Sequence, residues 1–231
     1  MKTKTIAYYL YFITCITALV AIVIDNEFLL LIAKPIIIPA VYFYYLTKAK
    51  TVNFFFTLVV LLSFVGDTVI LLKISDPLFV MVPYYLSYLI LIGFIVSDIV
   101  RIPSVNLTNV LLSLLVLSGH ALMLYLVLDL QTINGRKFIV PFSIYGVTLS
   151  LMVTLSAYNY LADKSISGFY MLIGCGCCLV SDVFYVLYNE HFHFPILTYI
   201  NSAMQFFTYI FLVKYILNRR TKRMIKPIVI D

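Results

Sequence analysis

The chain has 231 residues, of which 63% are hydrophobic and only 11% are charged, and its formal net charge is +6. This composition excludes a soluble globular domain, because too few polar residues remain to cover a soluble surface. The cations stand at the ends of apolar runs, so the positive charge favours contact with anionic lipid headgroups and argues against a nucleic-acid site.

Eight apolar stretches of near-spanning length follow one another along the chain. The first, within "MKTKTIAYYLYFITCITALVAIVI", has no convincing small-residue cleavage site, which favours a transmembrane helix over a cleaved signal. Short polar connections separate the stretches and leave no linker or soluble domain. The sequence therefore predicts an all-α integral membrane protein, one domain over residues 1–231 ending in a short basic tail at 218–231. The predicted transmembrane helices of the bundle are 5–24, 28–46, 52–72, 78–96, 106–128, 138–160, 168–188 and 195–217.

Lys and Arg residues are distributed unevenly between the two sides of this predicted bundle. Twelve stand on the side of the termini and three on the opposite side, with one lysine inside a helix left out. The positive-inside rule therefore predicts cytoplasmic N- and C-termini in a multi-pass protein of the plasma (inner) membrane. The twelve are Lys2, Lys4, Lys48, Lys50, Arg101, Lys164, Lys214, Arg219, Arg220, Lys222, Arg223 and Lys226.

Polar side chains inside the predicted spans converge on one level of the membrane. Asp67 and Asp182 lie about three-quarters of the way along two outward-running helices, and Lys34 lies roughly 9 Å into an inward-running helix. Three further polar residues approach this region: Tyr85, Tyr145 and Gln205. An ionisable group in a spanning helix costs roughly 2.5–3.5 kcal/mol on insertion scales and normally faces a partner or a cavity. The pattern predicts a polar pocket in the outer half of the bilayer.

Each of these charges also has a purely structural alternative. Lys34 is shallow enough to reach the outer headgroups, and either aspartate could make a hydrogen bond to a neighbouring helix. Asp98 ends the fourth predicted helix three residues before Arg101, which predicts a solvated helix-end pair.

Helix seven carries a packing signal beside its aspartate. Gly174, Cys178 and Ser181 form a stripe of small residues, which predicts the close approach of another helix. The cysteines of 175–178 point apart on a helix, and the segment 189–194 has two histidines and one acid with no third clear ligand, so neither favours a metal site. The sequence has no serine-hydrolase elbow, phosphate loop or zinc-protease motif. We expect no metal and no organic cofactor.

Five short segments resemble, in order, the YhhN/TMEM86-type lysoplasmalogenase family. They are "AKPIIIP", the "GD" of "SFVGDTVILL", "VPFSIYGVTLSLMVTLSA", "CGCCLVSDVFYVL" and "YINSAMQFFTYI". The resemblance covers helices two to eight. It implies an eight-helix membrane hydrolase that cleaves the vinyl ether bond of a lysoplasmalogen, giving a fatty aldehyde and glycerophosphoethanolamine or glycerophosphocholine.

The resemblance also implies roles for individual residues. Vinyl ether hydrolysis needs a protonated carboxyl group and a second group that stabilises the oxocarbenium ion and activates water. Burial favours the neutral form of a carboxyl group, so Asp67 and Asp182 are expected to divide these tasks as glycosidase carboxylates do. Lys34 is expected to bind the substrate phosphate or to favour the ionised form of one aspartate. The other residues expected to bind substrate are Tyr85, Tyr145, Ser181 and Gln205. Relatives often carry a His three residues before a Tyr in helix four, where this sequence has Tyr85 before Tyr88.

Two other functions stay open at this point. Buried Asp and Lys groups also mark proton-coupled or small-solute transporters, and the similar surroundings of Asp67 and Asp182 hint at a four-helix repeat. The concentration of polar groups in one half of the bundle favours an enzyme. A catalytically inactive lipid-binding relative is the third possibility. The expected partners are a lyso-ether phospholipid substrate and membrane lipids, and the sequence predicts no particular oligomeric state.

Overall fold

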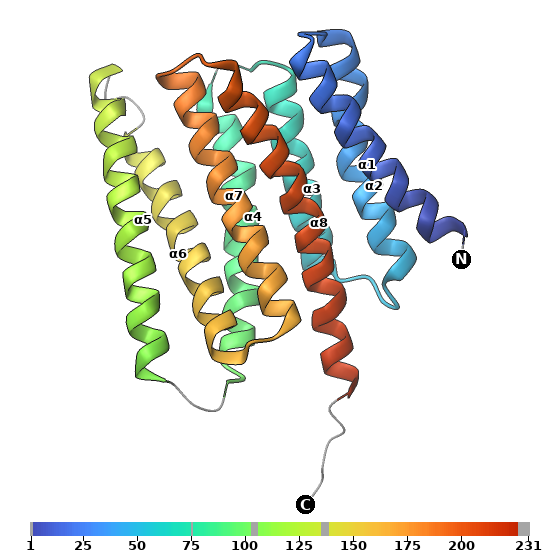
Figure 1. Ribbon diagram of the computed structural model, residues 1–231, viewed down its shortest axis with the longest axis vertical. Helices are drawn as coiled ribbons and strands as arrows, with labels where there is room; N and C mark the ends of the chain where they lie inside the picture. The colour runs from blue at the N-terminus through green and yellow to red at the C-terminus, as the bar shows by residue number, and fades with distance from the viewer. Residues whose placement is uncertain (1, 75, 103–105, 135–138, 226–231) are drawn as a thin grey trace, which may run out of the picture.

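The computed structural model describes residues 2–74, 76–102, 106–134 and 139–225. Eight helices occupy nearly all of these residues, and each is long and apolar enough to cross a membrane. Figure 1 shows an up-and-down bundle in which successive helices are antiparallel, so the predicted all-α bundle of eight spanning helices is confirmed. The helices are α1 Lys2–Val23, α2 Glu27–Lys48, α3 Phe54–Leu71, α4 Pro77–Ile99, α5 Leu107–Asn134, α6 Ile139–Asp163, α7 Ile166–Glu190 and α8 Pro195–Ile225.

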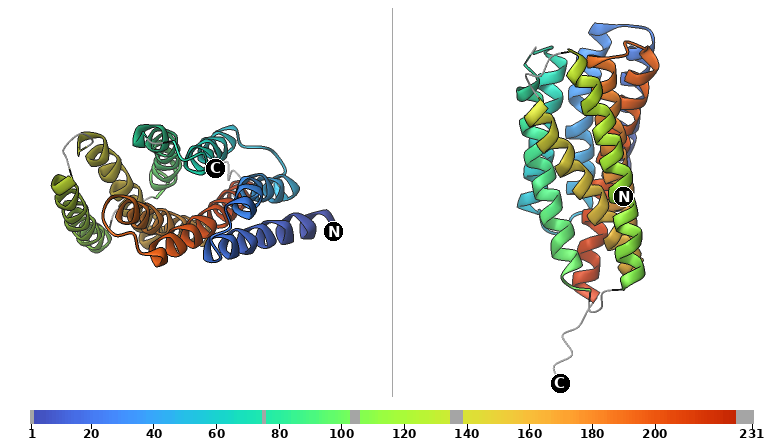
Figure 2. Two further views of the ribbon diagram at one scale, coloured as in Figure 1. Left: turned by 90° about the horizontal axis from the view of Figure 1, so that it is seen from above. Right: turned by 90° about the vertical axis from the view of Figure 1, so that its left-hand side faces the viewer.

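Helices that follow one another in sequence pack as the pairs α1–α2, α3–α4, α5–α6 and α7–α8. From above, the bundle is elongated, with α5 and α1 at opposite ends (Figure 2). Helix α4 also packs on α6, α6 on α7, and α2 on both α3 and α8. The middle of the bundle is therefore enclosed by α2, α3, α4, α6, α7 and α8.

Polar capping side chains fix the start of four helices. Asn26, Asn53, Asp76 and Ser165 each accept a hydrogen bond from a backbone N–H in the first turn of α2, α3, α4 and α7. Such caps satisfy N–H groups that have no partner within the helix. Because the rise per residue is constant, they also set the depth at which each inward-facing side chain lies.

The small-residue stripe of α7 faces α8, as its spacing predicted. A Cβ atom at Gly174 would lie 3.4 Å from Cδ2 of Leu212, and Thr208 Oγ1 lies 3.5 Å from the Gly174 carbonyl oxygen. Further along, Ser181 Oγ donates a hydrogen bond of 2.7 Å to Oδ1 of Asn201. The two helices therefore pack closely along the length that carries the polar residues.

One sequence prediction is wrong: Asp98 does not form a solvated pair with Arg101. Its Oδ1 lies 2.7 Å from Nε of Arg219, and its Oδ2 accepts a 2.6 Å hydrogen bond from the Tyr215 hydroxyl group. The Arg219 side chain is only 8% exposed. The cause is the length of α8, which continues to Ile225 past its predicted end at 217 and carries the guanidinium group to the end of α4. The segment predicted as a tail from 218 thus begins as helix, and its residues 226–231 lie outside the described part.

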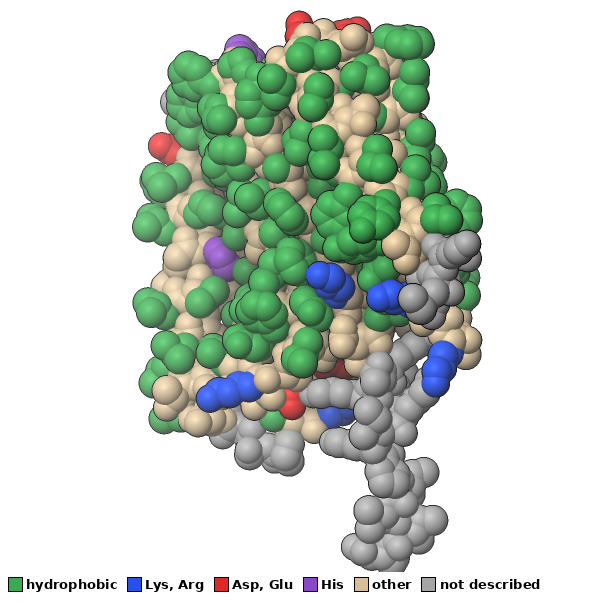
Figure 3. Space-filling model, turned by 45° about the vertical axis from the view of Figure 1, so that its right-hand side comes forward, with side chains coloured by type: hydrophobic (Ala, Val, Ile, Leu, Met, Phe, Trp, Pro, Cys, Tyr) green, Lys and Arg blue, Asp and Glu red, His purple; other side chains and the backbone are tan. Residues whose placement is uncertain are grey.

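The surface is apolar along most of the bundle and basic at one end. On the face in Figure 3, hydrophobic side chains cover the upper and middle parts, and Lys and Arg side chains gather toward the lower end. The connections α2–α3, α4–α5 and α6–α7 lie toward this end (Figure 1). The asymmetry supports cytoplasmic termini, which stay a prediction.

Candidate active site

Asp67 on α3 accepts three hydrogen bonds from side chains of α4 and α8. The Tyr84 hydroxyl group and Nε2 of Gln205 donate to Oδ1, and the Tyr209 hydroxyl group donates to Oδ2 at 2.8 Å. The Asp67 side chain is buried. An ionised carboxylate only accepts hydrogen bonds, so three donors suit a negative charge held away from water.

Gly66 makes room for the Tyr84 ring beside this carboxylate. A Cβ atom at position 66 would lie 2.7 Å from Cε2 and 2.8 Å from Cζ of Tyr84, closer than side-chain atoms tolerate. The glycine therefore admits the ring, and the aspartate that follows it accepts the hydrogen bond from the hydroxyl group. The two residues act as one structural unit.

Asp182 on α7 is held by two tyrosine hydroxyl groups. Those of Tyr88 on α4 and Tyr145 on α6 each donate a 2.6 Å hydrogen bond to Oδ2. The two hydroxyl oxygens are 3.3 Å apart. Within the described residues no hydrogen bond reaches Oδ1. One carboxyl oxygen is thus fixed by the protein, and the other is available to a bound molecule.

A cavity of about 360 Å³ lies between α2, α3, α4, α6, α7 and α8. Asp182 forms part of its wall, whereas Asp67 lies behind Tyr84 and Gln205, which line it. Residues of the α3–α4 connection and Asn189 near the end of α7 also line it, so the cavity reaches the end of the bundle opposite the basic one. Its volume suits a small-molecule site.

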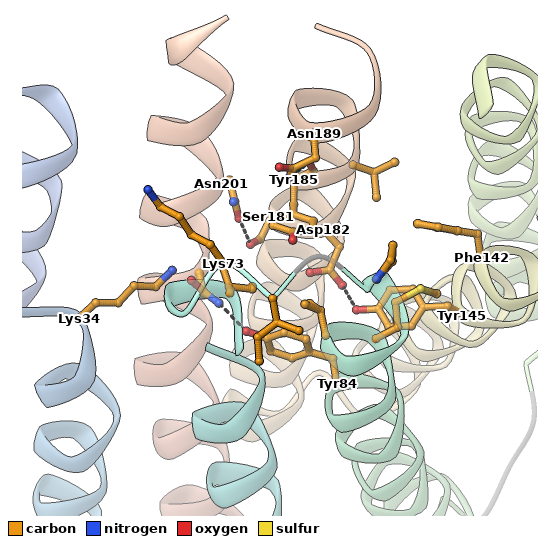
Figure 4. Close-up of a pocket in the computed structure, with 17 residues that line it drawn as sticks. Lys34, Lys73, Tyr84, Phe142, Tyr145, Ser181, Asp182, Tyr185, Asn189 and Asn201 are labelled. Atoms are coloured by element: carbon orange, nitrogen blue, oxygen red, sulfur yellow. Dashed lines mark hydrogen bonds between the residues drawn. The ribbon is translucent and has the colours of Figure 1, made fainter. Parts of the chain in front are cut away.

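The two sides of this cavity differ in polarity. Figure 4 shows Lys34 and Lys73 on one side and Phe142 and Tyr145 on the other, with Asp182 between them. Nζ of Lys73 lies 2.5 Å from Oε1 of Glu27, and this hydrogen bond raises the pKa of Lys73 above its ordinary value. Lys73 therefore stays protonated at neutral pH, with Glu27 as its partner. Within the described residues no ion pair reaches Lys34, so on this side Lys34 suits an anionic group.

A second, smaller cavity of about 20 Å³ separates the two aspartate centres. Its wall includes Tyr84, Tyr88, Asp182 and Tyr209, so hydroxyl groups from both centres meet there. A space of this volume is large enough for roughly one water molecule. The two aspartates are thus neighbours linked through tyrosines, and neither carboxylate contacts the other within the described hydrogen bonds.

One face of α8 serves both centres. Asn201, Gln205 and Tyr209 recur every four residues, which places them on a single helix face. Asn201 accepts from Ser181, next to Asp182, while Gln205 and Tyr209 donate to the other aspartate.

The sequence model of the YhhN family matches residues 29–216, most of the chain. The chain belongs to the YhhN family. No curated protein and no solved structure gives a significant match. The resemblance to the family that five sequence segments indicated is confirmed. The part matched by the YhhN family contains every residue of the two aspartate centres, and among the described residues no group of three His, Cys, Asp or Glu could hold a metal ion.

In this YhhN protein, most of the residues predicted for the site come together. Five of them line the larger cavity, namely Lys34, Tyr145, Ser181, Asp182 and Gln205. Asp67 lies directly behind its wall. Tyr85 is half-buried and is not among the residues that line the cavity.

Sequence reasoning found Tyr145 but missed the other three tyrosines that hold the two aspartates. Tyr84 and Tyr88 stand four residues apart on the buried face of α4. Tyr85 follows Tyr84 by one position, and one position turns a helix by about 100°. The buried positions Leu91 and Ile95 continue that face. The apolar periodicity could therefore have identified Tyr84 and Tyr88, and Tyr209 could have been found four residues after Gln205.

Proposed function

We propose that this YhhN protein hydrolyses the vinyl ether bond of a lysoplasmalogen, releasing a fatty aldehyde and a glycerophospho-head-group alcohol. The observation that carries the proposal is Asp182, a carboxyl group inside a spanning helix whose Oδ2 is held by Tyr88 and Tyr145 while its Oδ1 is left for a ligand in the cavity. Family membership supports the same activity.

Asp182 is the acid in this proposal. Its Oδ1 proton is transferred to the alkenyl carbon that does not carry the ether oxygen, and the electron pair of the double bond forms the new C–H bond. The adjacent carbon becomes an oxocarbenium ion. Water adds to that carbon and returns a proton to the Asp182 carboxylate, which leaves a hemiacetal. The hemiacetal hydroxyl group then loses its proton and forms the C=O bond of the aldehyde, while the bond to the glycerol oxygen breaks and that oxygen takes up the proton to leave as the alcohol. One carboxyl group thus serves as acid and then as base.

Asp67 acts through its neighbours. Three donors favour its ionised form, and Tyr84, which donates to it, lines the cavity. A fixed negative charge behind this wall stabilises a cation that develops in the cavity. Asp67 also orients Gln205, whose amide can position the attacking water molecule. Lys34 and Lys73 face the phosphate of the substrate at the opposite side of the cavity.

Release of aldehyde from 1-alkenyl-lysophosphatidylethanolamine by the purified protein tests this function. We expect Asp182→Asn to abolish release, because the amide cannot supply the proton. Asp163→Asn, the same change at an exposed position at the end of α6, serves as the matched control. No release by the folded wild-type protein would overturn the proposal.

A proton-coupled transporter is the alternative that the structure addresses most directly. The Asp98–Arg219 cluster gives the opposite end of the bundle its own polar centre. Leu91 and Ile95 of α4 and Leu212 and Val213 of α8 lie between the two centres along these helices, and all four are buried. From Tyr209 to Tyr215 this apolar layer spans six residues, or roughly 9 Å. It supports a one-sided cavity and hence an enzyme.

A further inference from the structure

A narrow apolar groove continues from the catalytic cavity toward the outside of the bundle. It lies between α5, α6 and α7 and has a volume of about 50 Å³. Phe142, Tyr145, Asp182 and Val186 line both the groove and the cavity, so the two spaces share a wall at the carboxyl group. Apart from Asp182, the groove has no charged side chain.

We infer that this groove binds the hydrocarbon chain of the substrate, next to the bond that is cleaved. The inference rests on the proposed function, because it places the protonated carbon at Asp182. When the phosphate lies at Lys34 and Lys73, the hydrocarbon chain of the substrate must extend from Asp182 toward the side of the cavity opposite these lysines. The groove begins at that side, and its apolar wall suits methylene groups and no charged head group.

Packing between α5 and α6 sets the width of the groove. A Cβ atom at Gly146 would lie 2.3 Å from Cδ1 of Leu124, so the glycine lets this leucine settle against α6. Leu124 and Leu128 stand four residues apart on α5, and both line the groove. The small volume admits only the first few carbons of a chain, and the rest extends beyond the groove.

The groove aligns the chain more than it adds affinity. A hydrocarbon chain is already surrounded by apolar groups in the bilayer, so transfer into an apolar groove gains little hydrophobic free energy. Alignment matters because a displacement of about 1 Å at the reacting atoms can lower the rate roughly 100-fold. Bulk added inside the groove should therefore misplace the vinyl ether of a long-chain substrate.

The first test compares Leu128→Phe with Leu126→Phe on the same helix. Leu128 lines the groove, whereas Leu126 is 54% exposed on the outer face of α5. With a hexadecenyl substrate we expect kcat/KM to fall roughly 10- to 100-fold in Leu128→Phe and to stay unchanged in Leu126→Phe. A propenyl substrate, whose chain ends at the mouth of the groove, should be affected far less. Equal losses on both substrates in a folded Leu128→Phe protein, or no loss on either, would overturn the inference.

The second test does not depend on catalysis. A saturated 1-alkyl-lysophosphatidylethanolamine with a diazirine on the fourth chain carbon is photolysed with the wild-type protein, and the labelled residues are mapped by mass spectrometry. We expect labels near Leu124, Leu128 and Val183, and competition by the unlabelled saturated analogue. Labels confined to other helices would refute the groove even if aldehyde is released. Labels in the groove without aldehyde release would support binding of the hydrocarbon chain there and refute the proposed hydrolysis.

Discussion

Tyr145 of α6 donates a hydrogen bond of 2.6 Å to Oδ2 of Asp182 on α7. With Tyr88 on the same oxygen, it fixes the rotation of the carboxyl group and turns Oδ1 toward the cavity. We expect Tyr145→Phe to lower kcat for vinyl ether hydrolysis roughly 10- to 100-fold. Asp182 becomes a carboxylate as its proton leaves, and a hydrogen bond to a charged group contributes about 1.5–3 kcal/mol, where about 1.4 kcal/mol is a factor of ten.

Steady-state aldehyde release measures this effect. Tyr125→Phe is the matched control, since Tyr125 is exposed on α5. The double variant Tyr88→Phe/Tyr145→Phe should lose less than the product of the single losses, because both hydroxyl groups orient the same oxygen. A Tyr145→Phe protein with the wild-type kcat would show that Tyr145 does not orient the acid.

Gly66→Ala should destabilise the protein and disturb the Asp67 centre. The new Cβ atom would meet the Tyr84 ring at 2.7 Å, so the ring must move and its hydroxyl group must leave Asp67. We expect a loss of about 1–3 kcal/mol, the usual cost of overpacking. Gly93→Ala on α4 is the control, because its Cβ atom meets nothing within 4 Å, and helix propensity predicts that it stabilises slightly. Thermal unfolding of both variants in detergent measures the difference. Equal stability of the two variants would contradict the predicted overpacking at position 66.

The pair Asp98–Arg219 should contribute to stability and not to chemistry. Asp98→Asn leaves a nearly buried guanidinium group without its counter-charge, which costs about 3–5 kcal/mol at a buried site. The double variant Asp98→Leu/Arg219→Met should be more stable than either single variant. Glu27→Gln, which breaks the exposed pair with Lys73, should leave the unfolding temperature unchanged. Loss of activity in a fully stable Asp98→Asn protein would speak against this assignment.

Lys34→Met should raise KM roughly tenfold or more for a substrate with a phosphate, because it removes a charge-assisted hydrogen bond of about 1.5–3 kcal/mol. Lys73→Met should have a smaller effect, since Lys73 is mostly exposed. Neither variant should change KM for a 1-alkenylglycerol, which has no phosphate. Lys50→Met, at an exposed position in the α2–α3 connection, is the control. A uniform rise in KM for both substrates would argue that the lysines do not bind phosphate.

The positive-inside rule predicts that the cavity opens away from the cytoplasm. In sealed cells, a membrane-impermeant maleimide should label Asp25→Cys in the α1–α2 connection and spare Lys50→Cys until the cells are permeabilised. Both positions are exposed. The unsubstituted chain measures the background from its own cysteines. The reverse labelling pattern would show that the protein has the opposite orientation in the membrane, with the cavity open to the cytoplasm.

Much of the fold follows directly from the sequence, because apolar runs of spanning length have few alternative structures. The predicted helices agree with α1 to α4, α6 and α7 to within three residues at each end, whereas α5 continues six residues past its predicted end at 128. The depth of Asp67, Asp182 and Lys34 also follows from counting residues along a helix. Which side of each helix faces inward was harder to predict than depth. On α4 the predicted site residue was Tyr85, whereas Tyr84 and Tyr88 are the tyrosines that face inward.

Contacts between distant helices could not be read from local patterns. Asp98 and Arg219 are separated by 121 residues, and nothing near Asp98 indicates that α8 would extend to its level. The nearest cation in sequence, Arg101, was therefore a misleading partner. The same holds for Tyr209 and Asp67, whose hydrogen bond depends on how α8 packs against α3.

The buried layer formed by Leu91, Ile95, Leu212 and Val213 also bears on cellular energetics. A membrane that stores energy as a proton gradient loses it through any continuous chain of hydroxyl and carboxyl groups. In the described residues of α4 and α8, such a chain stops at this layer. Along these two helices, a proton taken up by Asp182 meets no relay group toward the basic end of the bundle. The helices that supply Tyr84, Tyr88, Gln205 and Tyr209 to the site can therefore take part in acid chemistry without adding a path that discharges the gradient.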